Sequence, residues 1–400
     1  MISGNSFQKR VRRRVTGREQ SFFAATSPGL EDLCRKEILA LSFPKLSLSA
    51  SEGGVAFSGR VHDCYIANLH LRTANRILMR IAAFKATNFR MLKRKLTDFP
   101  WELYLQPHHP HELSVSARQS RLYHTEAIAD QFKASIMDRF EKNFQDLQDG
   151  RKAGWSQKIF VRVVGDGFTV SLDSSGDHLY KRGIKIQGGK APVRETIAAA
   201  VLQFAGYNGK EPLVDPMCGS GTFSMEGAMM ANHIPAGWYR QFAFEAWPSF
   251  RPERWKHIRR EAEKKFLRPE KPVIFSSDQD AAVCSRLNNL IKKNELSDTV
   301  LAFHQNFFDI SVSDLSNMIG KGRKGIVVIN PPYGLRIGTR KESETLFAEI
   351  CVKLSRDFKG WKLALIVPRR GLLRKIPFRV KKYPVFHGGL NLTLAAGRIR

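Results

Sequence analysis

The stretch Val214-Asp215-Pro216-Met217-Cys218-Gly219-Ser220-Gly221-Thr222 joins two apolar segments. Leu213 and Val214 are typical of the end of a buried strand, and the segment from about Phe223 is typical of a helix. Two glycines one residue apart allow a tight turn, and a helix N-terminus after such a turn is a usual place for a nucleotide-like ligand. The third glycine of the dinucleotide fingerprint and the Lys-Ser/Thr pair of the phosphate loop are both missing. The stretch predicts a strand–turn–helix ligand site, although an ordinary turn uses the same residues.

From residue 211 onward, short apolar runs alternate with helical segments, which is typical of a doubly wound α/β fold. Two apolar runs around His387-Gly388-Gly389 predict a closing antiparallel hairpin. We therefore expect a Rossmann-like, mostly parallel sheet that ends in this hairpin. The expected strands are 212–215, 273–277, 300–303, 326–329 and 362–367, and the expected helices are 223–232, 280–293, 343–354 and 369–375.

The preceding part of the chain has a different rhythm. Residues 21–180 mix strand and helix signals and predict an α+β region, in which we expect a helix over 63–79. The basic, glycine-rich residues 181–195 predict a linker, so a second domain would span 196–400. Residues 1–20 carry many Lys and Arg against a single acid, Glu19, and predict a basic flexible tail.

The overall charge favours a polyanionic partner. The 400 residues contain 65 Lys and Arg against 37 Asp and Glu, a net charge of +28, which points most simply to nucleic acid. The chain shows no secretory signal and no apolar run long enough to span a membrane. Five scattered cysteines without a Cys-x-x-Cys pair argue against a zinc site or a disulfide framework, so we expect no metal and a reducing cytoplasm.

Polar residues follow three further expected strands, namely 273–277, 300–303 and 326–329. Asp278 comes directly after 273–277, where an acid can hold ribose hydroxyl groups. Asn306 follows 300–303 and is placed to meet the edge of an adenine. Because ligands bind at the carboxyl ends of parallel strands, we expect these side chains to lie near the glycine turn.

The motif Asn330-Pro331-Pro332-Tyr333 follows the strand 326–329 and indicates the reaction. The Asn330 side-chain oxygen and the Pro331 carbonyl offer two acceptors, which suits the two donors of an exocyclic NH₂ group. Accepting both N–H bonds stabilises the positive charge that develops when this nitrogen attacks a methyl group. Tyr333 offers a face on which a flipped base can stack.

A candidate RNA-contact group lies at one strand-to-helix edge of residues 112–172. Charged and stacking side chains gather there, namely Arg118, Arg121, Tyr123 and His124. A merely polar loop would have the same composition, so this alternative stays open.

These motifs together resemble a known family, the S-adenosylmethionine-dependent amino-methyltransferases, and specifically the THUMP-domain guanine-N2 RNA methyltransferases that act on bacterial large-subunit (23S) ribosomal RNA. The resemblance extends from about residue 20 to 398. It rests on the glycine turn, the Asn-Pro-Pro-Tyr motif and several shorter stretches, among them Ser27-Pro28-Gly29-Leu30-Glu31, Ser120 to Glu126, Ser171 to Gly176, Lys181-Arg182-Gly183 and Phe242-Ala243-Phe244-Glu245.

The resemblance implies a ferredoxin-like plus THUMP RNA-binding region followed by a Rossmann-like methyltransferase domain. It implies S-adenosyl-L-methionine contacts at Asp215, Met217, Gly219, Gly221, Thr222, Asp278 and Asn306. It implies contacts to the target amine at Asn330 and Pro331, stacking by Tyr333, and an RNA contact at Arg336. Asn306 stands where the family usually has Asp, and Tyr180 stands where His is common.

Several other functions stay open on sequence grounds. Transfer RNA is an alternative substrate, because THUMP domains also serve tRNA enzymes. A DNA amino-methyltransferase or a protein-glutamine methyltransferase would use the same tetrapeptide. A non-catalytic RNA-binding assembly factor belongs to a different class, and intact Asp215, Gly219, Gly221 and Asn330 argue against it.

Overall fold

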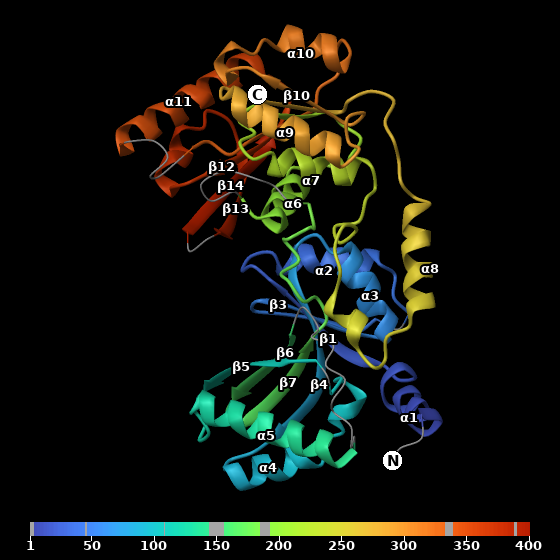
Figure 1. Cartoon of the computed structure of the whole chain (residues 1–400). Helices are drawn as coiled ribbons and strands as arrows, with labels where there is room; N and C mark the ends of the chain where they lie inside the picture. Colours follow the sequence, from blue (N-terminus) through green and yellow to red (C-terminus); the bar gives the residue numbers. More distant parts are fainter. Residues whose placement is uncertain are drawn as a thin grey trace. The chain divides into compact units, whose positions relative to one another are not determined.

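The computed structural model describes residues 4–44, 46–107, 109–143, 156–184, 193–332, 339–387 and 390–400. The chain forms two compact units, each with its own sheet (Figure 1). The first unit comprises residues 1–26, 34–179 and 240–260, and the second comprises 27–33, 180–239 and 261–400.

The first unit is built on a seven-stranded sheet in the order β2-β3-β1-β4-β7-β6-β5. Neighbouring strands pair antiparallel except for β5 and β6, which pair parallel. Its strands are β1 (Gln20–Thr26), β2 (Leu48–Ser51), β3 (Gly54–Gly59), β4 (Ala74–Lys85), β5 (His111–Arg118), β6 (Gln157–Val164) and β7 (Gly167–Asp173). Its main helices are α2 (Glu31–Ala40, from residue 34), α3 (Val61–His70), α4 (Phe89–Thr97) and α5 (Thr125–Asn143).

The expected flexible tail is helical in the structure. Helix α1 (Gly4–Val11) continues into a π-helix (Arg12–Thr16), and the apolar side chains of Val11 and Val15 are buried. The Arg10 guanidinium pairs with the buried Glu102 carboxylate at 2.6 Å. The two buried valines and this ion pair hold the segment in place. The high charge of residues 1–20 had favoured the prediction of a flexible tail, because it gives no sign of these contacts.

A segment expected in the second domain belongs to the first unit. Residues 240–260 carry a 3₁₀ turn (Ala243–Ala246) and begin α8 (Pro252–Glu263). The ring of Phe244 stacks on Tyr65 of α3 with centroids 4.3 Å apart. The Arg240 side chain donates to the Ser175 and His178 carbonyl oxygens at 2.8 and 2.7 Å. The burial of these aromatic rings therefore places residues 240–260 in the first unit, although the sequence predicted that the second domain would begin at residue 196 and include them.

The second unit has a mostly parallel sheet in the order β10-β9-β8-β11-β12-β14-β13. Its strands are β8 (Leu213–Asp215), β9 (Ile274–Asp278), β10 (Val300–His304), β11 (Ile326–Ile329), β12 (Lys362–Val367), β13 (Val380–His387) and β14 (Leu390–Arg398). β14 pairs antiparallel with both β12 and β13, which confirms the Rossmann-like sheet with a closing hairpin. The chain runs outward from β8 to β10 and then returns to β11, so the order reverses between β8 and β11.

Apolar side chains on both faces of this sheet are buried. Leu213 and Val214 are adjacent in sequence, yet they belong to two separate hydrophobic clusters, as successive residues of a strand should. The Leu213 cluster includes residues of α6 (Glu195–Phe204), α7 (Thr222–Ala231) and α9 (Ala281–Lys293). The Val214 cluster includes residues of α10 (Val312–Ile319) and α11 (Arg340–Asp357). Covering both faces explains why these strands are almost continuously apolar.

Candidate cofactor and amine site

The glycine turn after β8 uses its two glycines differently. Gly221 has φ +77°, and a Cβ there would lie 2.4 Å from Leu287 Cδ1 of α9. Gly219 also has a positive φ of +51°, but a Cβ there would meet no atom within 4 Å. Gly221 therefore allows close packing of the turn on α9, whereas Gly219 faces open space.

Two aspartates lie at the ends of neighbouring strands beside this turn. Asp278, at the end of β9, accepts hydrogen bonds from Gly219 N at 2.9 Å and from Asp280 N at 3.1 Å. Asp215, at the end of β8, is fully buried and accepts from Ser224 Oγ at 2.7 Å. Burial raises the pKa of Asp215 to about 7. Among the described residues, the Asp215 Oδ1 atom has no hydrogen-bond partner.

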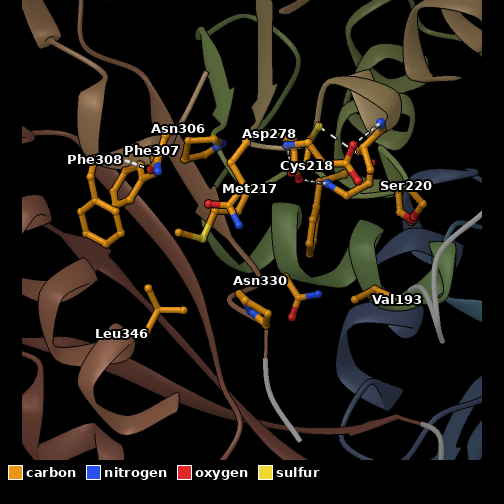
Figure 2. Close-up of a pocket in the computed structure, with 18 residues that line it drawn as sticks. Val193, Met217, Cys218, Ser220, Asp278, Asn306, Phe307, Phe308, Asn330 and Leu346 are labelled. Atoms are coloured by element: carbon orange, nitrogen blue, oxygen red, sulfur yellow. Dashed lines mark hydrogen bonds between the residues drawn. The ribbon is translucent and has the colours of Figure 1, made fainter. Parts of the chain in front are cut away.

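A cavity of about 440 Å³ opens beside the turn, at the carboxyl ends of β8, β9, β10 and β11 (Figure 2). Figure 2 shows Phe308 and Leu346 at one end, Ser220 and Val193 at the other, and Asn330 between them. The expected residues that line it are Met217, Gly219, Thr222, Asp278, Asn306 and Asn330. The position at the reversal of strand order is where α/β sheets bind ligands.

Asn330 brings an unsatisfied acceptor to this cavity. It directly follows β11, and its Oδ1 atom is buried without a partner among the described residues. Pro331 is buried, Pro332 lines the cavity, and Tyr333 and Arg336 lie outside the described residues. A buried acceptor without a partner is costly in a folded protein, so a ligand that donates N–H or O–H bonds would be stabilised here.

Two of the residues expected to contact the cofactor do not line the cavity, and a third makes a further contact of its own. Asp215 and Gly221 do not line the cavity: Asp215 is buried against Ser224, and Gly221 packs on α9. Asn306 does line it, but its Oδ1 also accepts from Phe308 N at 3.0 Å and caps a 3₁₀ turn. That contact engages the oxygen and leaves the second lone pair and the amide NH₂ group for a ligand.

Sequence reasoning missed most of the apolar lining. Val193, Val283, Phe307, Phe308 and Leu346 line the cavity together with Cys218 and Phe223. The aromatic pair directly after Asn306 was the only local signal. The pKa of the Cys218 thiol is raised, first by burial and then by Asp215 and Asp278, so this thiol is not set up as a nucleophile.

The predicted RNA-contact residues lie at the end of β5 and in the loop before α5, in the first unit. Arg118 ends β5, and Arg121 N donates to Asp166 Oδ1 at 2.7 Å, which orders the loop before α5. The rings of Tyr123 and His124 lie 4.1 Å apart, and the Tyr123 side chain is 64% exposed. An exposed ring of this kind is suited to stacking on a base.

The residues of the cavity fit S-adenosylmethionine. Asp278 provides a carboxylate near the glycine turn, Gly219 leaves room for a close approach, and Met217, Phe307 and Phe308 provide apolar surface. Within the described parts of the chain, no group of three His, Cys, Asp or Glu side chains is arranged to hold a metal ion. None of the helices in those parts has the length and apolarity needed to cross a bilayer. The fold and the cavity define an S-adenosylmethionine-dependent methyltransferase.

Comparison with known families agrees with this class. Residues 182–396 match the family described as "RMKL-like, methyltransferase domain", and residues 21–78 match the "RlmL ferredoxin-like domain". The chain belongs to the RMKL-like methyltransferase family, and the resemblance seen in its motifs is confirmed.

The relatives differ in how much of their own length this chain covers. A protein of Synechocystis sp. that carries the provisional name RNA methyltransferase slr0064 is 29% identical over 93% of this chain and 95% of its own length. The "Ribosomal RNA large subunit methyltransferase K/L" of Syntrophotalea carbinolica is 31% identical over 93% of this chain. This chain spans 53% of the length of that relative.

Two solved structures are similar over most of the chain. SMU.472, provisionally named a methyltransferase and crystallised with SAH, has a TM-score of 0.83 and 26% identity over 96% of this chain and 98% of its own. A Listeria monocytogenes protein described as a predicted N6-adenine-specific DNA methylase has a TM-score of 0.82 and 26% identity over 95% of this chain and 96% of its own. Both agree with the fold, and the SAH bound to SMU.472 agrees with the cofactor class.

Proposed function

We propose that this protein transfers a methyl group from S-adenosylmethionine to the exocyclic N2 amine of a guanosine in large-subunit (23S) ribosomal RNA, in the cytoplasm. The observation that carries the proposal is the buried, unsatisfied Oδ1 of Asn330 at the cavity. An acceptor at this place calls for an N–H donor, and an exocyclic amine supplies two.

The bound cofactor supplies an electrophilic methyl group. In the proposal, Asn330 Oδ1 and the Pro331 carbonyl accept the two N–H bonds of the amine and stabilise the charge that develops on its nitrogen. Tyr333 stacks on the flipped base. Asp278 binds the ribose hydroxyl groups of the cofactor, while the buried Asp215 accepts a hydrogen bond from Ser224 of α7.

The RNA assignment rests on charge and on the first unit. The net charge of +28 favours a nucleic acid, and residues 21–78 match a ferredoxin-like domain described for RlmL. We infer that residues 21–180 include a THUMP-type RNA-binding region. Within it, Arg118, Arg121, Tyr123 and His124 would contact RNA, and Arg336 would do so in the second unit.

Mass spectrometry of nucleosides tests this function. The protein and S-adenosylmethionine are incubated in parallel with unmodified 23S ribosomal RNA, unmodified tRNA and double-stranded DNA. N2-methylguanosine in 23S RNA alone is the expected result. N2-methylguanosine in tRNA alone would keep the reaction and change the substrate. Methyladenine in DNA would contradict the RNA assignment.

A further inference from the structure

A second cavity, of about 470 Å³, lies in the first unit, and the site described above does not use it. Three segments far apart in the sequence line it: the π-helix near Arg12, the start of α3 near Arg60, and the segment that begins α8 near Arg251. Arg251 Nη2 donates to Thr16 Oγ1 at 3.3 Å and so ties the third segment to the first. We call this cavity the basic pocket.

The lining of the basic pocket is rich in cations. It holds four guanidinium groups and one imidazole, from Arg12, Arg60, Arg251, Arg254 and His62. The hydroxyl-bearing residues Thr16, Ser249 and Tyr65 also line it, and no Asp or Glu does. Arginine forks and hydroxyl groups are the side chains that bind phosphate oxygens.

These arginines differ from the structural arginines of the same unit. Arg10 and Arg139 both pair with the buried Glu102 carboxylate, at 2.6 and 2.9 Å. Among the residues that the structure describes, none of the four pocket guanidiniums is paired with a carboxylate. Arg10 and Arg139 each have a carboxylate partner, whereas the lining of the basic pocket concentrates positive charge and contains no acid.

The acid at the start of α3, Asp63, is already engaged. The buried Asp63 carboxylate accepts from Arg60 N at 2.7 Å and lies 3.5 Å from His62 Nε2, and it does not line the pocket. The pKa of His62 is lowered, chiefly by burial and then by Arg254 and Arg60, against the opposing effect of Asp63. Val61 and His62 are in the first turn of α3, where backbone N–H groups lack helical acceptors and add to the positive potential.

The pocket is firmly built on one side. The rings of Tyr65 and Phe244 stack 4.3 Å apart, and Trp255 packs edge-on against Phe244 at 5.2 Å. Tyr65, Phe244 and Trp255 are buried, so their rings hold α3, the 3₁₀ turn and α8 together, and Tyr65 itself lines the pocket. Rigid packing of these elements reduces the conformational entropy that the arginines lose when they bind an anion.

We propose that the basic pocket is a phosphate-binding site that takes a backbone phosphate of the RNA substrate. The inference rests on the proposed function, because it assumes that the substrate is RNA. It assigns RNA binding to residues of the π-helix, of the start of α3 and of the segment that begins α8. These residues are separate from the Arg121–Tyr123 group on the β5–α5 edge. Because phosphate contacts position an RNA without reading its sequence, the pocket would set affinity rather than choice of base.

The test compares Arg254→Ala and Arg60→Ala with Arg260→Ala as the matched control. Arg260 is an exposed arginine on the same helix as Arg254, and it does not line the pocket. The affinity for fluorescent 23S RNA fragments is measured over a series of salt concentrations. Each pocket variant is expected to bind about tenfold more weakly, with a salt slope reduced by about one, whereas the control stays close to wild type.

A second arm identifies the occupant. Inorganic pyrophosphate is titrated calorimetrically into the wild type and the same variants, and S-adenosylmethionine affinity is measured as a check that the second unit is intact. If pocket variants lose pyrophosphate binding but keep RNA affinity and salt slope, the pocket takes a free phosphate compound and the RNA assignment is wrong. If they match Arg260→Ala in both assays, the basic pocket is no phosphate site.

Failure of the proposed function would look different. In that case the wild-type protein itself would fail to methylate any RNA, whatever the pocket variants do. A wild type that methylates 23S RNA, with pocket variants that bind it equally well, would overturn this inference alone.

Discussion

The Gly219 amide donates to Asp278 Oδ2 over 2.9 Å and thereby joins the turn after β8 to the end of β9. The same carboxylate accepts from Asp280 N, so its direction is set by two backbone groups. The Gly219 amide thus helps to orient the Asp278 carboxylate at the cavity, and the carboxylate in return holds the backbone of the turn.

Removing this link should weaken cofactor binding. In Asp278→Ala, Gly219 N loses its acceptor and the cavity loses its carboxylate, so we expect the dissociation constant of S-adenosylmethionine to rise about 10- to 100-fold. Calorimetric titration measures it. Asp298→Ala, which removes an exposed carboxylate of the same unit outside the cavity, should leave it unchanged. Equal affinities for wild type and Asp278→Ala would contradict the assignment.

The two glycines of the turn should respond differently to alanine. Gly221→Ala places a methyl group 2.4 Å from the buried Leu287 at a positive φ, so we expect a loss of about 1–3 kcal/mol in the free energy of unfolding. Gly219→Ala meets no neighbour within 4 Å and should cost only about 1 kcal/mol, while cofactor affinity falls. Urea denaturation and cofactor titration separate the two effects. The reverse order of stabilities would contradict this account.

Asn330→Ala should reduce turnover about 10²- to 10³-fold and leave S-adenosylmethionine affinity within a few-fold of wild type, because the lost acceptor acts on the target amine. Single-turnover methylation and cofactor titration measure the two quantities. The matched control is Asn208→Ala, which changes an exposed asparagine of the same unit that accepts from Lys210 N. A parallel loss of cofactor affinity in Asn330→Ala would show that this residue serves the cofactor instead.

Asp215 should make the stability of the cofactor-free protein depend on pH. Its pKa is raised from 3.8 to about 7, so between about pH 4 and pH 7 the unfolded chain has lost a proton that the folded chain keeps. Stability therefore falls as the pH rises through this window. In Asp215→Asn that fall should be smaller, as measured by urea denaturation at several pH values. An identical pH slope in both proteins would disprove the raised pKa.

Tyr123→Ala should weaken RNA binding without destabilising the fold, because the side chain is 64% exposed and a stacked base is worth about 1–3 kcal/mol. Met137→Ala removes a side chain of the same unit that is 60% exposed and serves as the control. Fluorescence anisotropy with 23S RNA fragments measures the affinity. If both variants bind RNA equally well, Tyr123 is an ordinary surface residue.

Local patterns were sufficient for the parallel strands of the second unit. The strands expected at 212–215, 273–277, 300–303, 326–329 and 362–367 are present within about one residue, because strands buried on both faces are short and continuously apolar. The helix expected over 63–79 is wrong: α3 ends at His70 and β4 begins at Ala74. The few apolar residues of this segment fit both the helical and the strand period of hydrophobicity. The pairing of β4 with β1 and β7 made the second half of the segment a strand.

The sequence by itself determined the glycine turn, the Asn-Pro-Pro-Tyr motif and their place after buried strands, because these features depend on backbone sterics and on runs of apolar residues. Only the tertiary structure decided which glycine lines the cavity, that Asp215 is buried against Ser224, and that Arg12, Arg60 and Arg251 line one pocket. Thr16 and Arg251, which hydrogen-bond to each other, are 235 residues apart. Such pairings follow from strand order and from the burial of distant apolar side chains, for which a linear sequence carries no local signal.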